Sequence, residues 1–125
     1  MVEFTVQPRV SGITPEHPAA LRAATELYDD LRRINGCSVE DRRRSVDGAK
    51  GTASDLILAL GGPAVVGSVV AVFRLWLRRD ARDRSLLLRR GLDGEDALVE
   101  IRGTNVSDQT IRQALDRMLQ QHNED

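Results

Sequence analysis

Few residues in this 125-residue chain have the types and spacing that chemistry requires. The segment Gly48-Ala49-Lys50-Gly51-Thr52 is similar in composition to a phosphate-binding loop. In that motif a lysine directly follows the last glycine, so that backbone N–H groups and the ammonium surround the phosphates. Here the lysine precedes the glycine and the leading spacing is absent. We therefore interpret the segment as a flexible entry to the next element.

Nucleophiles and acid–base groups also lack partners. A serine or cysteine nucleophile needs a base within reach, but His17 lies in a proline-rich stretch and His122 lies near the C-terminus. Cys37 is the only cysteine, which favours a structural thiol and excludes a cysteine-rich zinc site. The carboxylate pairs at 29–30 and 95–96 are expected on solvated surfaces. The sequence predicts no enzyme, with no catalytic, cofactor-binding or metal-ligating residue and no cofactor.

Composition limits the class of partner. Eighteen basic and nineteen acidic residues give a net charge of −1, and aromatic residues make up 3%. These values argue against nucleic-acid binding by bulk charge or by base stacking. The arginines over 74–90 keep an acidic protein or anionic lipid headgroups as alternatives, and the triplet at 42–44 keeps a phosphate-binding patch. Residues 2–6 have a strand-like pattern with no secretory signal. With one cysteine, we expect a cytoplasmic protein.

The first half of the chain predicts three elements. Residues 2–7 alternate between apolar and polar, which indicates a strand. A loop with three prolines follows from Pro8 to Pro18. Residues 19–34 carry one apolar stripe at helical spacing and end at Asn35-Gly36, a good helix stop. A second, weak strand is expected at 37–40, followed by loop-like residues.

The second half predicts a broken helix, a hairpin and a final helix. Ser54 and Asp55 suit a helix start, so we expect a short helix over 55–60. Gly61-Gly62-Pro63 breaks it, and proline suits the first turn of a longer helix over 63–79. Residues 85–90 and 97–102 predict a β-hairpin around an Asp-Gly turn, and Ser107 caps the last helix.

This order, β-α-β-α(broken)-β-β-α, predicts one α+β domain over residues 1–125. Its sheet is expected to be small and mixed, with about four strands and with helices packed on it.

The uncharged run over residues 56–73 is the most informative segment. Eighteen helical residues would reach only about 27 Å, less than the roughly 30 Å of a bilayer core. The glycines and the proline favour a buried helical hairpin. Residues 64–73 are apolar nearly all round, however, and such a helix must be covered on every side. We expect self-association or a membrane to supply this cover. The predicted interaction residues are Val65, Val66, Gly67, Val69, Val70 and Phe73, with Trp76, Arg74, Arg78 and Arg79 at the rim.

Most of the chain resembles the effector-associated constant component family of bacterial conflict systems. The matching segments are residues 2–6, Leu27-Tyr28-Asp29-Asp30-Leu31-Arg32, Asp55-Leu56-Ile57-Leu58-Ala59-Leu60-Gly61-Gly62 and Phe73-Arg74-Leu75-Trp76-Leu77-Arg78-Arg79, followed by the hairpin and the last helix. Pro63 and the basic run at 42–44 depart from the family pattern. The resemblance implies a small α+β domain that acts beside caspase-like or trypsin-like proteases in antiviral immunity, with no assigned catalytic residues.

Two functional hypotheses follow. The first is a non-enzymatic adaptor that forms a homo-oligomer or binds a protease through helix 63–79. The alternative is a membrane-active effector, in which proteolysis of loop 41–52 releases residues 56–77. In that loop Arg42, Arg43 and Arg44 suit a trypsin-like protease and Asp47 suits a caspase-like one. A third hypothesis is a nucleic-acid or nucleotide binder that uses Arg42–Arg44 and the later arginines. The near-neutral net charge and the scarcity of aromatic residues argue against it, so we expect no nucleic-acid partner.

Overall fold

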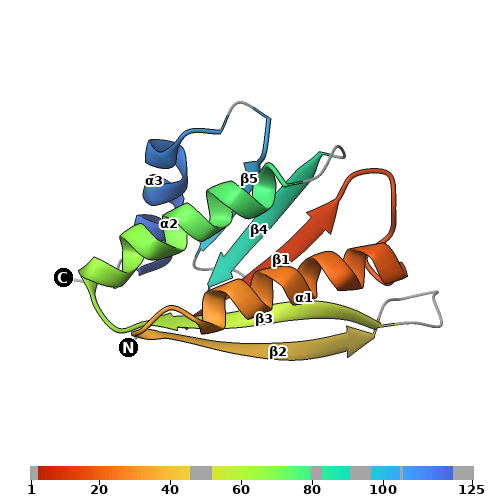
Figure 1. Cartoon of the computed structure of the whole chain (residues 1–125), viewed down its shortest axis with the longest axis horizontal. Coiled ribbons are helices and arrows are strands. Elements are labelled where there is room, and N and C mark those ends of the chain that lie inside the picture. The colour runs from red at the N-terminus through yellow and green to blue at the C-terminus, as the bar shows by residue number, and fades with distance from the viewer. Residues whose placement is uncertain (1–2, 46–51, 80–82, 91–96, 105, 120–125) are drawn as a thin grey trace.

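A computed structural model describes residues 3–45, 52–79, 83–90, 97–104 and 106–119. The elements follow in the order β1 (Glu3–Val10), α1 (Pro18–Arg32), β2 (Cys37–Ser45), β3 (Thr52–Leu60), α2 (Pro63–Leu77), β4 (Arg84–Arg90), β5 (Ala97–Arg102) and α3 (Asp108–Leu119). The strands form one sheet in the order β2-β3-β1-β4-β5 (Figure 1).

The predicted α+β class is confirmed. The sequence predicted a mixed sheet of about four strands, whereas the sheet has five strands and all four neighbouring pairs run antiparallel. The β4–β5 hairpin pairs Ser85 with Arg102 and Arg90 with Ala97, as the sequence predicted. Its turn, residues 91–96, lies outside the described residues.

The predicted short helix over residues 55–60 is wrong, because this segment is the second half of β3. Leu56, Leu58 and Leu60 alternate along the strand and are all buried. This period of two places them on the helix-covered face, where Leu56 and Leu58 pair with Val6 and Phe4 of β1. Ser54 and Asp55 are therefore strand residues and do not cap a helix.

Two other strands extend further than predicted. Strand β1 continues through Pro8 to Val10, although the sequence predicted a loop from Pro8. The pairing of β1 with β3 ends at Val6, so the missing N–H of Pro8 breaks no bond of that ladder. Strand β2 continues to Ser45 and contains the three arginines at 42–44.

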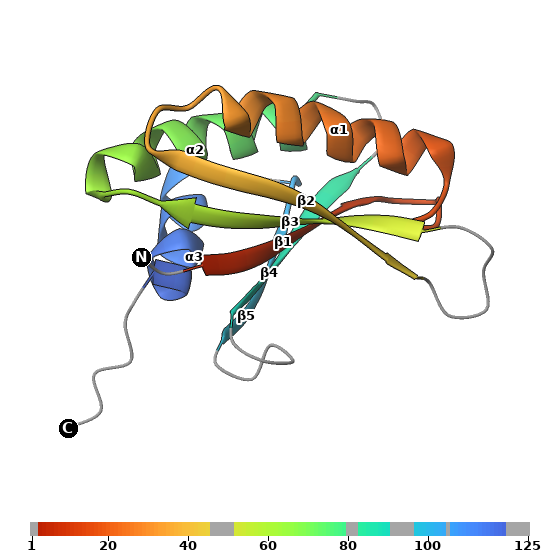
Figure 2. The same ribbon diagram turned by 90° about the horizontal axis from the view of Figure 1, so that it is seen from below.

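The helices pack together over one face of the sheet. Helices α1 and α2 lie side by side above the strands (Figure 2), and α2 lies between α1 and α3 (Figure 1). Beneath them Phe4, Val6, Leu86 and Leu88 are almost completely buried. On the opposite face, strand residues such as Leu87 are only half-buried, and Leu98 is 56% exposed.

Candidate interaction surface

Half of the predicted interaction residues form the core. Val66, Val69, Val70, Phe73 and Trp76 are at most 4% exposed, so in this structure they present no surface to a partner. This corrects the expectation that the domain cannot cover helix 63–79. The sheet below α2 and the helices on both sides of it supply that cover.

Two further predicted residues are half-buried at the sides of α2. Val65 packs close to Gly36, where an added Cβ would lie 2.7 Å from a Val65 methyl carbon. Gly36 has a φ of +88°, a conformation that glycine adopts readily. Gly67 faces α3, where the Arg112 guanidinium would lie 3.5 Å from an added Cβ. Both residues therefore serve packing between elements of the domain.

The outward side of α2 carries a different set of residues, which we call the α2 stripe. Leu75 is 57% exposed and is one of two large exposed apolar side chains among the described residues. It shares its side of the helix with small residues at steps of three and four, as the period of 3.6 requires. The α2 stripe consists of Ala64, Ser68, Ala71, Val72 and Leu75. Ala64 and Ser68 are exposed, and Ala71 and Val72 are half-buried.

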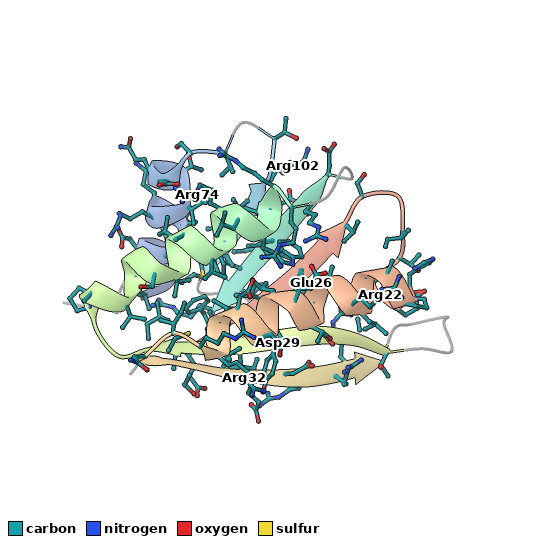
Figure 3. All side chains as sticks on the ribbon, viewed as in Figure 1. Arg22, Glu26, Asp29, Arg32, Arg74 and Arg102 are labelled. Atoms are coloured by element: carbon teal, nitrogen blue, oxygen red, sulfur yellow. The ribbon has the colours of Figure 1, made fainter. Side chains whose placement is uncertain are left out.

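The three arginines predicted for the rim of an interaction surface border the α2 stripe, and each has a partner within the domain. On the α3 side, Arg74 Nη1 lies 2.6 Å from Asp108 Oδ2, and Arg78 Nη2 donates to the Val106 carbonyl at 2.8 Å. Figure 3 shows Arg74 directed from α2 toward α3. These contacts tie α2 to the segment that begins α3.

On the α1 side, Arg79 Nη2 donates to Asp30 Oδ2 at 2.9 Å, and its Nη1 lies 3.6 Å from Glu26. The hydrogen bond with Asp30 raises the pKa of the Arg79 guanidinium above its usual value. Arg79 is thus held against α1 and forms the charged border of the α2 stripe there.

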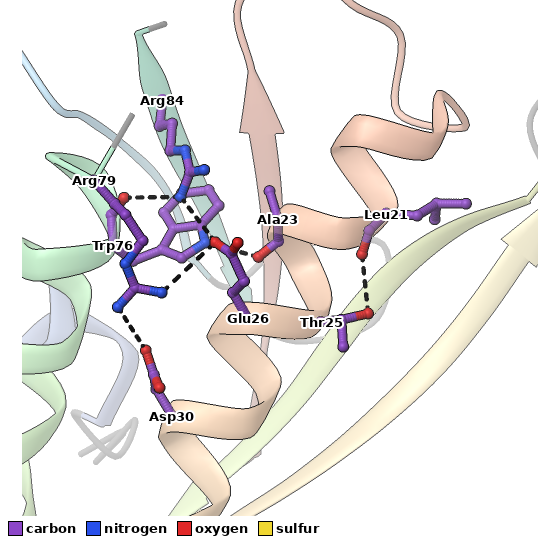
Figure 4. A network of polar contacts seen from close by, with 8 residues as sticks. All are labelled: Leu21, Ala23, Thr25, Glu26, Asp30, Trp76, Arg79 and Arg84. Atoms are coloured by element: carbon purple, nitrogen blue, oxygen red, sulfur yellow. Dashed lines mark hydrogen bonds and ion pairs between the residues drawn. The ribbon is translucent and has the colours of Figure 1, made fainter. Parts of the chain in front are cut away.

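Trp76 anchors α2 from inside the domain (Figure 4). Its indole Nε1 donates to the Ala23 carbonyl of α1 at 2.8 Å. The Arg84 guanidinium lies over the Trp76 ring at 4.7 Å from the centroid, and Arg84 Nη1 donates to the Trp76 carbonyl at 3.1 Å. The same Nη1 lies 3.6 Å from Glu26. This arrangement joins α1, α2 and β4 around one buried ring.

The uncovered face of the sheet carries a polar row across three strands. Arg44 Nε donates to Asp55 Oδ1 at 2.9 Å, Gln7 Nε2 donates to Asp55 Oδ2 at 3.4 Å, and Arg9 donates to Gln7 Oε1 at 3.3 Å.

A cleft of about 630 Å³ lies at the end of β1, β4 and β5. Its exposed charged groups include two arginines and two carboxylates: Arg9, Arg102, Asp83 and Glu100. The lining of the cleft therefore carries charges of both signs.

Three of the residues predicted for a protease-sensitive loop are in a paired strand. Arg42, Arg43 and Arg44 lie in β2 opposite Asp55, Ser54 and Ala53 of β3. Hydrophobic and charged residues alternate poorly over this stretch, so the sequence did not indicate a strand there. Asp47 lies outside the described residues.

Comparison of the chain with protein-family models, curated proteins and solved structures finds no match. Among the described residues, no helix is long and apolar enough to cross a membrane. Within the same residues, no group of three or more His, Cys, Asp or Glu side chains is arranged to hold a metal ion.

The structure also predicts that Cys37 reacts slowly with alkylating reagents. Burial raises the pKa of this thiol from 9.0 to about 11, because desolvation disfavours the thiolate. Two pKa units reduce the thiolate fraction below pH 9 about 100-fold, and the thiolate is the reactive species. The more basic thiolate is intrinsically up to about tenfold more nucleophilic, which offsets part of this loss. Alkylation by iodoacetamide at pH 8 should therefore be at least about tenfold slower than for the same chain in urea, and it should accelerate up to about pH 11. Similar native and unfolded rates would contradict this.

Proposed function

We propose that this protein is a non-enzymatic interaction module that self-associates through the α2 stripe. The observation that carries this proposal is Leu75, which projects from a helix whose other outward residues are small or apolar. Although 30% of the residues in the chain are charged, this face of α2 carries no charge between its two borders. An apolar centre with a charged rim rich in arginine is the usual anatomy of a protein–protein interface.

A second copy of the chain fits this surface by size. If two α2 helices pack antiparallel about a two-fold axis between residues 68 and 72, Leu75 of each copy lies over Ala64 of the other. Ser68 of each copy then lies against Val72 of the other. Large side chains meet small ones at both ends, which allows the helices to approach closely. A two-fold interface uses the same patch on both copies, so no other surface is needed.

The charged borders suit the same arrangement. Arg74 and Asp108 on one side, and Arg79 with Asp30 on the other, are already neutralised within each copy. They therefore add little repulsion between copies, and they remain at the solvated rim. Ion pairs of this kind favour specificity more than affinity.

We infer a role as an adaptor in a bacterial antiviral conflict system, with a caspase-like or trypsin-like protease as its partner. This inference depends on the resemblance of the sequence to effector-associated constant component domains. A self-associating adaptor increases the local concentration of whatever is attached to it. Clustering by a small non-enzymatic domain could therefore activate a protease that is attached to it.

The membrane-active alternative is less well supported. Its releasable segment, residues 56–77, includes part of β3, which lies hydrogen-bonded between β2 and β1. Release would break both ladders and expose the core side chains of α2. Helix α2 itself has 15 residues, or about 22 Å of length, which is short for a bilayer of roughly 30 Å.

The test is the mass of the full chain in solution, measured by light scattering and sedimentation over a range of concentrations. We expect Leu75→Glu to weaken association at least about tenfold, because it places an unpaired charge against Ala64 of the other copy, inside the apolar contact. Its thermal unfolding should stay close to wild type, since this side chain is exposed.

Gln113→Glu is the matched control, because it introduces the same charge at an exposed position of α3, away from the α2 stripe. Unchanged association of this variant and weakened association of Leu75→Glu support the proposal. Equal masses for Leu75→Glu and wild type, or a monomeric wild type at every concentration, would overturn it.

A further inference from the structure

Two strands, β2 and β5, form the edges of the sheet, and they differ in where their charges lie. Strand β2 has charged side chains on both faces: Glu40, Arg42 and Arg44 on one, and Asp41 and Arg43 on the other. Charges that point to the helix-covered side, as Asp41 does beside Leu56, discourage pairing with another chain. Strand β2 therefore has the usual features of an edge that stays unpaired.

Strand β5, the other edge, carries charges on its outer face but no inward-pointing charge among its described side chains. Its helix-side residues Val99 and Ile101 are apolar, and Ile101 is 2% exposed. Its outer side chains are Leu98, Glu100 and Arg102. Among the described residues, β4 is its sole strand neighbour. An unpaired edge of this kind offers backbone N–H and C=O groups to another strand.

The charges of β5 select both the partner and the register. If β5 pairs antiparallel with β5 of a second copy, two-fold symmetry requires that opposed residues point to the same face of the joined sheet. A register centred on Val99 places Glu100 of one copy opposite Leu98 of the other. A register centred on Glu100 places the two Glu100 residues opposite each other. A register centred on Ile101 places Glu100 of each copy directly opposite Arg102 of the other.

Within one chain, Arg102 Nε lies 3.3 Å from Glu100 Oε1, and the Arg102 side chain is 77% exposed. The arginine is therefore accessible to a second carboxylate. Opposite charges directly across neighbouring strands stabilise a ladder.

We propose that β5 is a second self-association surface, at which two copies join their sheets edge to edge with Ile101 at the axis. This surface differs from the α2 stripe and does not depend on it. Two different two-fold interfaces on one protomer link each copy to two others, so the assembly extends beyond a dimer. The chain would then build an oligomeric scaffold, and the α2 stripe alone would give only pairs.

The experiment combines opposite charge reversals, in full-length chains that also carry Leu75→Glu to remove the α2 contact. We expect the Leu75→Glu chain to be a dimer. Adding Glu100→Arg opposes two arginines across the axis, and adding Arg102→Glu opposes two glutamates. Each reversal should weaken dimerisation at least about tenfold, because attraction becomes repulsion at two symmetric positions.

An equimolar mixture of the two variants should form heterodimers, detected by native mass spectrometry, in which the arginine introduced into one chain faces the glutamate introduced into the other.

Mixing separates this proposal from an effect within one chain. Each variant loses its own Glu100–Arg102 contact, and mixing cannot restore that contact. Heterodimers in the mixture, together with monomers of each variant alone, support the ladder between copies. A monomeric Leu75→Glu chain, single reversals that still dimerise, or a mixture that stays monomeric would each overturn it. These results are independent of the α2 proposal, which is tested by comparing wild type with Leu75→Glu.

Discussion

Replacing Trp76 by alanine should lower the free energy of unfolding by about 3–5 kcal/mol. The side chain is fully buried, so its removal leaves a cavity beneath the junction of α1, α2 and β4. It also removes the hydrogen-bond donor to the Ala23 carbonyl and the ring beneath the Arg84 guanidinium. Small domains have about 5–15 kcal/mol of stability in total. Urea unfolding followed by circular dichroism would measure the change.

Trp76→Phe is the control that separates volume from hydrogen bonding. Phenylalanine retains an aromatic face for Arg84 but leaves the Ala23 carbonyl without the indole donor, so we expect a smaller loss of about 1–3 kcal/mol. If Trp76 instead lay at the rim of an interface, as the sequence suggested, its replacement would weaken association and leave unfolding almost unchanged. A loss below about 1 kcal/mol for the alanine variant would contradict the core position.

Helical residues were predicted well because their apolar positions repeat. Residues 19–34 and 63–79 have the spacing of amphipathic or buried helices, with glycine or proline at their boundaries. Helices α1 and α2 begin and end within about two residues of these expectations, which is the usual uncertainty of a helix end. Local signals were sufficient for both.

The segment at 55–60 shows why a short apolar run is ambiguous. Its apolar residues Leu56, Ile57, Leu58, Ala59 and Leu60 are continuous, so neither a period of two nor one of 3.6 stands out. The pairings with β1 on one side and β2 on the other decide in favour of a strand. Those partners lie about 50 and 20 positions earlier in the chain, and no local pattern identifies them.

The α2 stripe lies on the helix that the sequence singled out, but it consists of other residues than those predicted for interaction. Because α2 is apolar nearly all round, the sequence did not show which side faces the sheet. Ser68 was the available signal, since a polar residue marks the outward side, and Ala64 and Leu75 follow from it at helical spacing. The partners of the arginines were not predictable, because Arg79 contacts Asp30 and Arg74 contacts Asp108 through tertiary packing alone.

The bonds after Arg42, Arg43 and Arg44 should resist trypsin in the native protein. A protease binds its substrate as an extended, unpaired segment, whereas these residues form a ladder with β3. Cleavage requires local opening of β2, and opening that costs about 3 kcal/mol leaves roughly 1 chain in 100 accessible. We therefore expect cleavage at these three bonds to be at least about 100-fold slower than in the urea-unfolded chain, with the products identified by mass.

This prediction also tests how a protease could act on the protein. If native cleavage after the three arginines is slow, a trypsin-like partner does not find its target in β2, and the adaptor proposal needs no cut there. Asp55→Ala is a useful companion, because it removes the acceptor of both Arg44 and Gln7 and weakens the polar row that holds β2 against β3. Cleavage after Arg44 should accelerate in that variant while the far edge of the sheet, at β5, remains protected from hydrogen exchange. Rapid native cleavage at residues 42–44 would contradict a stable β2 and would favour proteolytic release as the route to activation.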